Sequence, residues 1–119
     1  MDFNSNLPIY IQIMDYLKKQ IISRELKEGD KLDSVRELST KLKVNPNTIQ
    51  RSYQELEREG LVYTQRGMGT FVTEDVEVIS KFKREMASDV VGSFIIEMKQ
   101  LGFNRDDIVE LVNTKVGEV

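Results

Sequence analysis

The stretch SVRELSTKLKVNPNTIQRSYQELEREG, residues 34–60, carries the start signals of two helices separated by a tight turn. Ser34 followed three residues later by Glu37 fits a capping box, in which the hydroxyl accepts from the Glu37 amide and the carboxylate accepts from the Ser34 amide. Asn45 is a favourable N-cap and Pro46 a favourable first helical residue, so the next helix begins soon after the first one ends. The stretch therefore predicts a short helix, a tight turn and a second helix.

Each of these helices has an apolar side at helical spacing. The first has a stripe of Val35, Leu38 and Leu42. The predicted inward face of the second comprises Ile49, Ser52, Tyr53 and Leu56, and Gly60 offers a left-handed stop. The side chains that project elsewhere are polar and form hydrogen bonds: Asn47, Thr48, Gln50, Arg51 and Gln54. The second helix is therefore predicted to expose a polar face.

The residues after Gly60 change in character. The runs LVYTQ and TFVT are rich in β-branched and aromatic residues, and they flank RGMG at residues 66–69. Because glycine accepts positive φ angles, this pattern predicts a β-hairpin with a basic, flexible tip.

On the N-terminal side, Pro8 suits a first helical turn, and apolar residues then recur on one face as far as Ile21. A helix is predicted over about residues 8–25. Gly29 and Asp30 interrupt the pattern within LKEGDKL, residues 26–32, which predicts a connecting loop.

A second periodic segment begins near Asp75. Its apolar residues advance by three or four positions: Ile79, Phe82, Met86, Val90, Phe94, Met98 and Leu101. This spacing predicts a helix of about 27 residues, which Gly102 ends. Asn104 and Asp107 cap a further helix. Its apolar stripe comprises Ile108, Leu111, Val112 and Val116.

The order of these elements predicts a mainly α fold with a small β-hairpin. We expect a winged helix-turn-helix over residues 1–73 and a helical extension over residues 74–119. With 119 residues, the chain suffices for one compact module and an appendage. No apolar run approaches the roughly 20 residues that span a bilayer, so we expect a cytoplasmic protein without a membrane partner.

The composition argues against enzymes and metal sites. There is no cysteine and no histidine, which removes disulfides, thiolate or imidazole ligands and the commonest nucleophile and base pairs. We therefore expect no catalytic residues, no metal and no cofactor. The net charge is −3, but residues 34–72 are the basic part, at +2, between an N-terminal segment at −1 and a C-terminal segment at −4.

The run EGDKLDSVRELSTKLKVNPNTIQRSYQELEREGLVYTQRGMGTFV resembles the hallmark of the GntR family of transcription regulators, and the resemblance covers about residues 7–73. The PIYIQI segment, the recognition segment VNPNTIQRSYQELEREGL and the short helical tail are similar to the YtrA subfamily. One departure is Asp33, where the family usually has proline. Asp33 puts a negative charge near DNA, and as a capping residue it could share or replace the role of Ser34.

The resemblance implies which residues contact DNA. These are Arg36, Asn47, Thr48, Gln50 and Arg51, with Arg66 and Gly67 at the wing, whereas Ser34, Asn45 and Pro46 position the helices. The chemistry agrees, because amide side chains pair with adenine edges and arginine binds phosphate or guanine. A glycine at the wing lets the backbone approach a minor groove, and arginine supplies the cation that narrow grooves attract. Without the resemblance, these positions would be plain caps, a solvated helix face and a routine hairpin turn.

The tail is predicted to form a homodimer. Two helices do not enclose a core of their own, so their apolar stripe needs another surface. The predicted dimer residues are Phe82, Met86, Val90, Phe94 and Met98. Gly92 within the long helix suggests a close helix approach across the dimer. The alternative reading of the stripe is the lining of an effector cavity.

The resemblance implies a repressor of its own operon, often one that encodes a transporter, which an unidentified small-molecule effector releases from DNA. A two-fold dimer would present its recognition helices to successive major grooves, so the partner is double-stranded DNA with an inverted repeat. The competing hypothesis is a winged-helix adaptor that binds another protein and no duplex DNA. An enzyme is the third hypothesis, but no nucleophile has a plausible base nearby.

Overall fold

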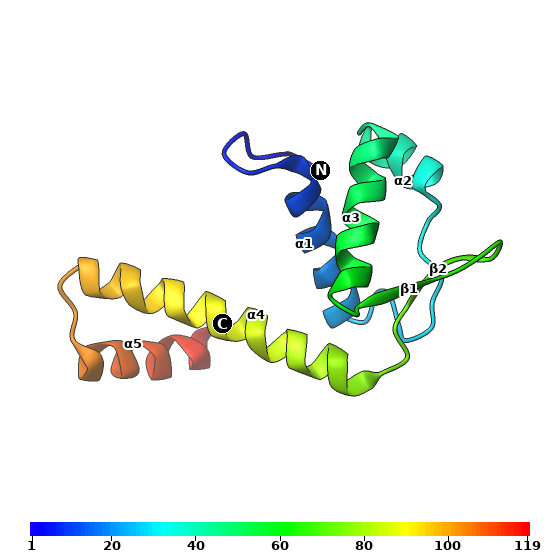
Figure 1. The fold of residues 1–119 in the computed structure, drawn as a ribbon. Helices are drawn as coiled ribbons and strands as arrows, with labels where there is room; N and C mark the ends of the chain where they lie inside the picture. Colours follow the sequence, from blue (N-terminus) through cyan, green and yellow to red (C-terminus); the bar gives the residue numbers. More distant parts are fainter. The chain divides into compact units, whose positions relative to one another are not determined.

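The computed structural model describes all 119 residues and contains five helices and one hairpin (Figure 1). The elements are α1 (Ile9–Ile22), α2 (Val35–Leu42), α3 (Pro46–Arg58), β1 (Val62–Gln65), β2 (Gly69–Val72), α4 (Val76–Gln100) and α5 (Arg105–Glu118). They confirm the predicted class, a winged helix-turn-helix followed by two helices. None of the helices is long and apolar enough to cross a bilayer. The chain divides into two compact units, residues 1–82 and 83–119, which we describe separately.

The core of the first unit lies between α1, α2, α3 and the hairpin. Its buried members are Ile13, Met14, Leu17, Ile21, Leu32, Leu38, Ile49, Tyr53, Leu56, Leu61, Val62 and Val72. The inward faces predicted for α1 and α3 therefore pack against each other. Burial of each large aliphatic side chain contributes about 1.5–3 kcal/mol, so these contacts stabilise the arrangement of the helices.

The turn between α2 and α3 follows the predicted caps. The Ser34 hydroxyl accepts from the Glu37 amide and the Glu37 carboxylate accepts from the Ser34 amide, both at 3.0 Å. Lys43 then takes a left-handed conformation, φ 56°, which ends α2, and the Asn45 side chain caps α3. The left-handed lysine was not predicted, because a glycine or asparagine is the usual residue at such a position.

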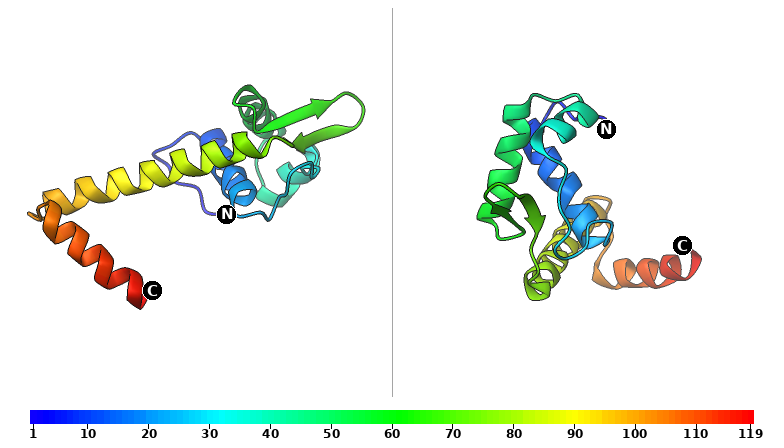
Figure 2. Two further views of the ribbon diagram at one scale, coloured as in Figure 1. Left: turned by 90° about the horizontal axis from the view of Figure 1, so that it is seen from below. Right: turned by 90° about the vertical axis from the view of Figure 1, so that its right-hand side faces the viewer.

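Residues 29–32 were predicted only to connect α1 to α2, but they also pair with the hairpin. Lys31 pairs with Phe71 of β2, the Leu32 amide donates to Thr70 at 2.8 Å, and the Val72 amide donates to Asp30 at 2.8 Å. The segment thus adds an isolated antiparallel bridge at the edge of the two-stranded hairpin. The hairpin itself pairs Val62 with Val72 and projects away from the three helices (Figure 2).

The first turns of α4 belong to the first unit. Val78, Ile79 and Phe82 pack against its core, and the Lys18 ammonium lies 5.4 Å from the centre of the Phe82 ring. The sequence analysis instead placed Phe82 among the side chains that need a second subunit. The structure supplies a surface from the same chain, because α1 lies beside the start of α4.

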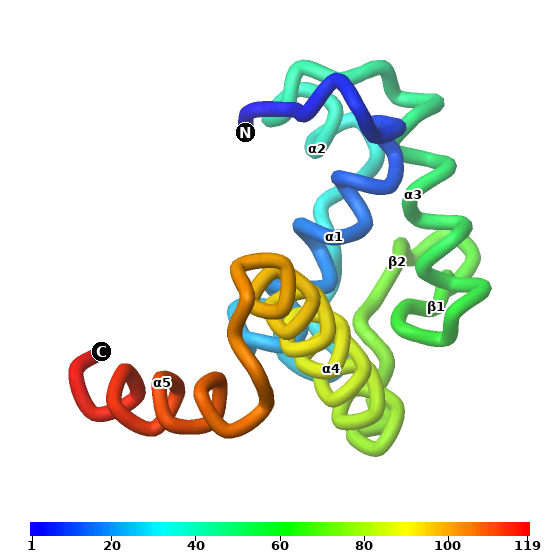
Figure 3. The backbone as a smooth tube through the Cα atoms, turned by 90° about the vertical axis from the view of Figure 1, so that its left-hand side faces the viewer, coloured from blue at the N-terminus to red at the C-terminus, as the bar shows by residue number.

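The second unit consists of the rest of α4 and of α5. After Gly102, φ 93°, the chain turns and α5 leaves α4 at an angle (Figure 3). Asn104 and Asp107 form a second capping box at the start of α5, as predicted. Ile108 is the one buried side chain of this unit, and Val90, Leu101 and Val116 are each about 70% exposed.

Candidate nucleic-acid interface

The exposed face of α3 is polar, and the opposite face is buried. Ile49, Ser52, Tyr53 and Leu56 are all in the core. Asn47, Gln50 and Arg51 are exposed, and Thr48 is half-buried. The amide and guanidinium groups predicted to contact DNA therefore lie on the solvent side of a helix whose orientation the core determines.

The N-terminus of α3 is held by Asn45. Its side-chain oxygen accepts from the Asn47 amide at 2.8 Å, and its carbonyl oxygen accepts from the Thr48 amide at 3.0 Å. Pro46, which has no amide hydrogen, occupies the first helical position. The positive end of the helix dipole is thereby exposed, and such an end favours anions.

Three arginines of the first unit have no carboxylate partner within salt-bridge distance. They are Arg36 on α2, Arg51 on α3 and Arg66 at the hairpin tip. The other two arginines of this unit are paired, Arg24 with Glu28 and Arg58 with Glu55. Of its lysines, Lys18 and Lys41 form ion pairs and the others do not. The three unpaired guanidinium groups coincide with the arginines predicted to bind DNA, and they remain able to bind phosphate or a guanine edge.

The wing tip has the open geometry that close approach to a duplex needs. Gly67 has φ 79°, and a Cβ atom added there would meet nothing within 4 Å. Gly69, with φ 124°, has a different role, because a Cβ atom there would lie 2.7 Å from Cε of Lys31. The absence of a side chain at Gly69 thus leaves room for the Lys31 side chain. Behind the tip, the rings of Tyr63 and Phe71 stack at 5.7 Å and stiffen the hairpin.

Asp33 does not take over the capping role of Ser34. Its carboxylate binds the Lys41 ammonium at 2.7 Å, and its carbonyl oxygen accepts from the Tyr53 hydroxyl at 2.6 Å. The bond to Asp33 raises the pKa of Lys41, and burial raises the pKa of the Tyr53 hydroxyl, so both groups keep their protons at neutral pH. The negative charge of Asp33 is therefore balanced within the chain.

One contact of this face was missed by the sequence analysis. The guanidinium carbon of Arg51 lies 3.8 Å from the centre of the Tyr10 ring on α1. The sequence holds no signal for this pair, because the two residues lie on different helices far apart in the chain. The Glu57 carboxylate of α3 accepts from the Thr64 amide of β1 at 2.8 Å, which ties the recognition helix to the wing. No group of three or more acidic, histidine or cysteine side chains is placed to hold a metal.

Comparison with known sequences identifies related proteins. The family model described as "Bacterial regulatory proteins, gntR family" matches residues 9–72. The HTH-type transcriptional regulator YhcF of Bacillus subtilis is 45% identical over 112 residues, which cover 94% of this chain and 93% of that protein. The HTH-type transcriptional repressor YtrA of the same bacterium is 37% identical over 113 residues, which cover 94% and 87%.

Solved structures show the same fold. A GntR family transcriptional regulator from Listeria monocytogenes is 45% identical and superimposes with a TM-score of 0.88 over 94% of this chain and 98% of that one. The DNA-binding domain of AraR in complex with operator ORR3 is 29% identical and matches with a TM-score of 0.56 over 61% of this chain and 86% of that one.

Proposed function

Since the chain belongs to the gntR family of bacterial regulatory proteins and is a DNA-binding transcriptional regulator, we propose that it acts as a homodimeric repressor of its own operon. Its proposed DNA contacts are the seven residues predicted at the start: Arg36, Asn47, Thr48, Gln50, Arg51, Arg66 and Gly67. The observation that carries this proposal is the set of three arginines without carboxylate partners on α2, α3 and the wing. A cytoplasmic location follows from this role.

The chemistry of α3 supports sequence-specific reading of the major groove. The amides of Asn47 and Gln50 suit the N6 and N7 edge of adenine, and each bidentate contact of this kind contributes about 1–3 kcal/mol of discrimination. Arginines at the flanks of the helix and at the wing suit phosphates and a narrow minor groove. In the AraR complex a domain with this fold is bound to an operator.

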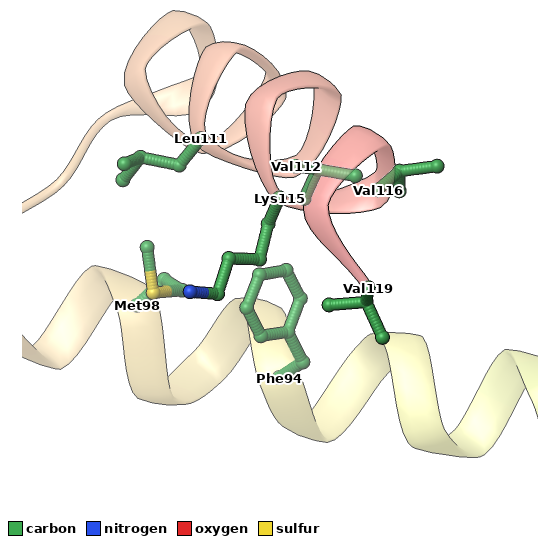
Figure 4. A pocket seen from close by; sticks show the side chains of 7 residues that line it. All are labelled: Phe94, Met98, Leu111, Val112, Lys115, Val116 and Val119. Atoms are coloured by element: carbon green, nitrogen blue, oxygen red, sulfur yellow. The ribbon is translucent and has the colours of Figure 1, made fainter.

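The second unit supports the proposed homodimer. Between α4 and α5 lies an apolar groove of about 470 Å³, in which Phe94 and Met98 face Leu111 and Val112 (Figure 4). Lys115 is its one charged lining residue. An exposed apolar groove in a unit with one buried side chain favours contact with another apolar surface. A second copy of the chain has the same groove, so two copies can cover each other. We assign the contact to Met86, Val90, Phe94 and Met98, with Phe82 at its margin.

Regulation is proposed by analogy with the relatives. YtrA is named a repressor. For this chain we propose repression of its own operon, which in this subfamily often encodes a transporter, and release from DNA by a small-molecule effector. The groove between α4 and α5 is assigned to dimer contact, and no ligand residues are named.

The first experiment is binding of the purified protein to a labelled duplex from the region upstream of its own gene. Fluorescence anisotropy at two salt concentrations should show an affinity that falls steeply with salt, because phosphate contacts release counterions. An inverted repeat with half-sites about 34 Å apart should bind better than a scrambled duplex of equal length. Binding that ignores salt and sequence would favour the adaptor hypothesis, in which the winged fold binds only protein.

Two substitutions separate the proposed contacts. Arg51→Ala should weaken binding to matched and scrambled duplexes alike, because it removes a phosphate contact. Asn47→Ala should mainly reduce the preference for one half-site position, because it removes base reading. Equal losses on both duplexes for both variants would contradict this division of roles.

A further inference from the structure

Arg51 rests on an aromatic ring from another helix. Its guanidinium carbon lies 3.8 Å from the centre of the Tyr10 ring. A planar guanidinium group is attracted to the face of such a ring, and a distance this short is a stacked arrangement. Arg51 is exposed, whereas Tyr10 is half-buried and packs against the core of the first unit. A cation of the proposed DNA face is thus supported by a side chain anchored below it.

The backbone of Tyr10 is held against α3 independently of the Arg51 side chain. The hydroxyl of Ser52, which is fully buried, donates to the carbonyl oxygen of Tyr10 at 2.9 Å. This bond joins α1 to α3 at the residue next to Arg51. A buried hydrogen bond is costly to leave unmade, so the position of Tyr10 relative to α3 is set before the arginine stacks on it.

The stack leaves the donors of Arg51 free. The ring engages the face of the guanidinium, whereas its N–H groups lie in the plane and point outward from the edge. Arg51 forms no ion pair, unlike Arg58 on the same helix, which binds Glu55 at 3.2 Å. An arginine that is already immobilised loses less side-chain freedom when it binds a phosphate or a base edge.

We infer that Tyr10 is a positioning residue for DNA binding, which holds Arg51 in its contact geometry before a duplex arrives. The inference rests on the proposed function and deepens it, because it assigns part of the DNA affinity to a residue of α1 that need not touch DNA. Immobilisation of one long side chain corresponds to roughly a threefold to tenfold change in affinity.

The decisive variants keep or remove the ring. Tyr10→Phe keeps the aromatic face and should bind the labelled upstream duplex as the unaltered protein does. Tyr10→Leu keeps an apolar side chain without a face and should bind about threefold to tenfold more weakly. Tyr16→Leu is the matched control, because Tyr16 is a half-buried tyrosine of α1 that packs on the same core and carries no arginine. It should change duplex affinity little, whatever it does to the unfolding midpoint.

A double-mutant cycle tests whether Tyr10 acts through Arg51. In an Arg51→Ala background, Tyr10→Leu should cause no further loss of affinity. Additive losses, or a Tyr10→Leu protein that binds like the unaltered one, would overturn the inference.

A readout without DNA separates this inference from the proposed function. In the free protein, the side-chain NMR signals of Arg51 should carry a ring-current shift that Tyr10→Leu removes and Tyr10→Phe retains. Signals that do not respond to Tyr10→Leu would overturn the positioning role. If the unaltered protein shows no salt-sensitive duplex binding at all, the proposed function fails, and with it the role in DNA binding, even where the stack itself is observed.

Discussion

The two units of the chain use similar side chains with opposite results. In the first unit, apolar residues from three helices, a hairpin and a connecting segment meet in a core of twelve buried hydrophobic residues. In the second unit, α4 and α5 carry a comparable set of valines, isoleucines and leucines, yet Ile108 alone is buried. Apolar content therefore does not make a core by itself. A core needs elements that surround the apolar side chains, and two helices offer only one mutual contact face.

The largest expected effect compares a buried with an exposed aliphatic side chain. Leu56→Ala should lower the free energy of unfolding by about 2–5 kcal/mol, because it leaves a cavity in the core of the first unit. Val116→Ala removes a side chain that is 70% exposed in the single chain, so at concentrations at which the protein is monomeric it should stay within about 0.5 kcal/mol. Urea denaturation monitored by tyrosine fluorescence measures both. A loss for Val116→Ala that appears at high protein concentration and disappears on dilution would show that a second copy covers this residue.

The second effect concerns the groove of the second unit. Phe94→Asp places a carboxylate in the proposed dimer contact and should weaken dimerisation about a hundredfold, because burial of an unpaired charge is costly. Lys99→Asp introduces the same group at an exposed position of the same helix and serves as the control. Sedimentation velocity over a range of protein concentrations should show monomers for the first variant alone. Dimers of unchanged stability in Phe94→Asp would place the subunit contact elsewhere.

A smaller effect compares the two capping boxes. Ser34→Ala should lower the free energy of unfolding of the first unit by about 0.5–2 kcal/mol, because α2 is part of its core. Asn104→Ala removes the equivalent cap of α5, and its cost should appear as local fraying of α5 with little change in the first unit. Hydrogen exchange resolved by residue distinguishes the two results. Equal global destabilisation by both variants would mean that the two units unfold together.

The smallest effect is a pH dependence confined to the first cap. Hydrogen bonds from the Ser34 amide and then the Ser34 hydroxyl lower the pKa of Glu37. The pKa of the folded state is thus below that of the unfolded state. The stabilising contribution of the Glu37 carboxylate is present above the ordinary glutamate pKa range and is lost as the pH falls through the lowered pKa of the folded state. The unaltered protein should therefore be more stable than Glu37→Gln at neutral pH, and the gap should close on acidification. Thermal unfolding of both proteins from neutral to acidic pH measures this difference in stability. A difference that persists at acidic pH would contradict the prediction.

The first unit was predictable where its signals are local. The caps at Ser34 and Asn45, the stop at Gly60 and the alternating strands around residues 66–69 each depend on neighbours a few positions away. The polar face of α3 followed from the same local pattern, since its inward stripe implies a polar opposite side, whereas the choice of DNA contacts came from the resemblance to the GntR family. The exposed position of this face in the structure agrees with that prediction, while contact with DNA stays a proposal.

Other features depend on partners that lie far apart along the chain. The strand-like pairing of Lys31 with Phe71, the hydrogen bond from the Tyr53 hydroxyl to the Asp33 carbonyl oxygen, and the packing of Phe82 on the first unit all lie in this class. A periodic pattern shows that a side chain is apolar, but the pattern does not show which surface covers it. Phe82 and Phe94 have the same place in one stripe, yet Phe82 packs on the core of the first unit whereas Phe94 lines an open groove.

The amino-acid sequence alone determined the helices, their caps, the hairpin and the polar face of α3, because hydrogen bonds and periodicity within a few residues specify them. Tertiary structure decided which charges remain unpaired, which tyrosine supports Arg51 and where the core ends along α4. These outcomes depend on distances between side chains that the fold brings together, and such distances are not encoded in any single stretch of the chain.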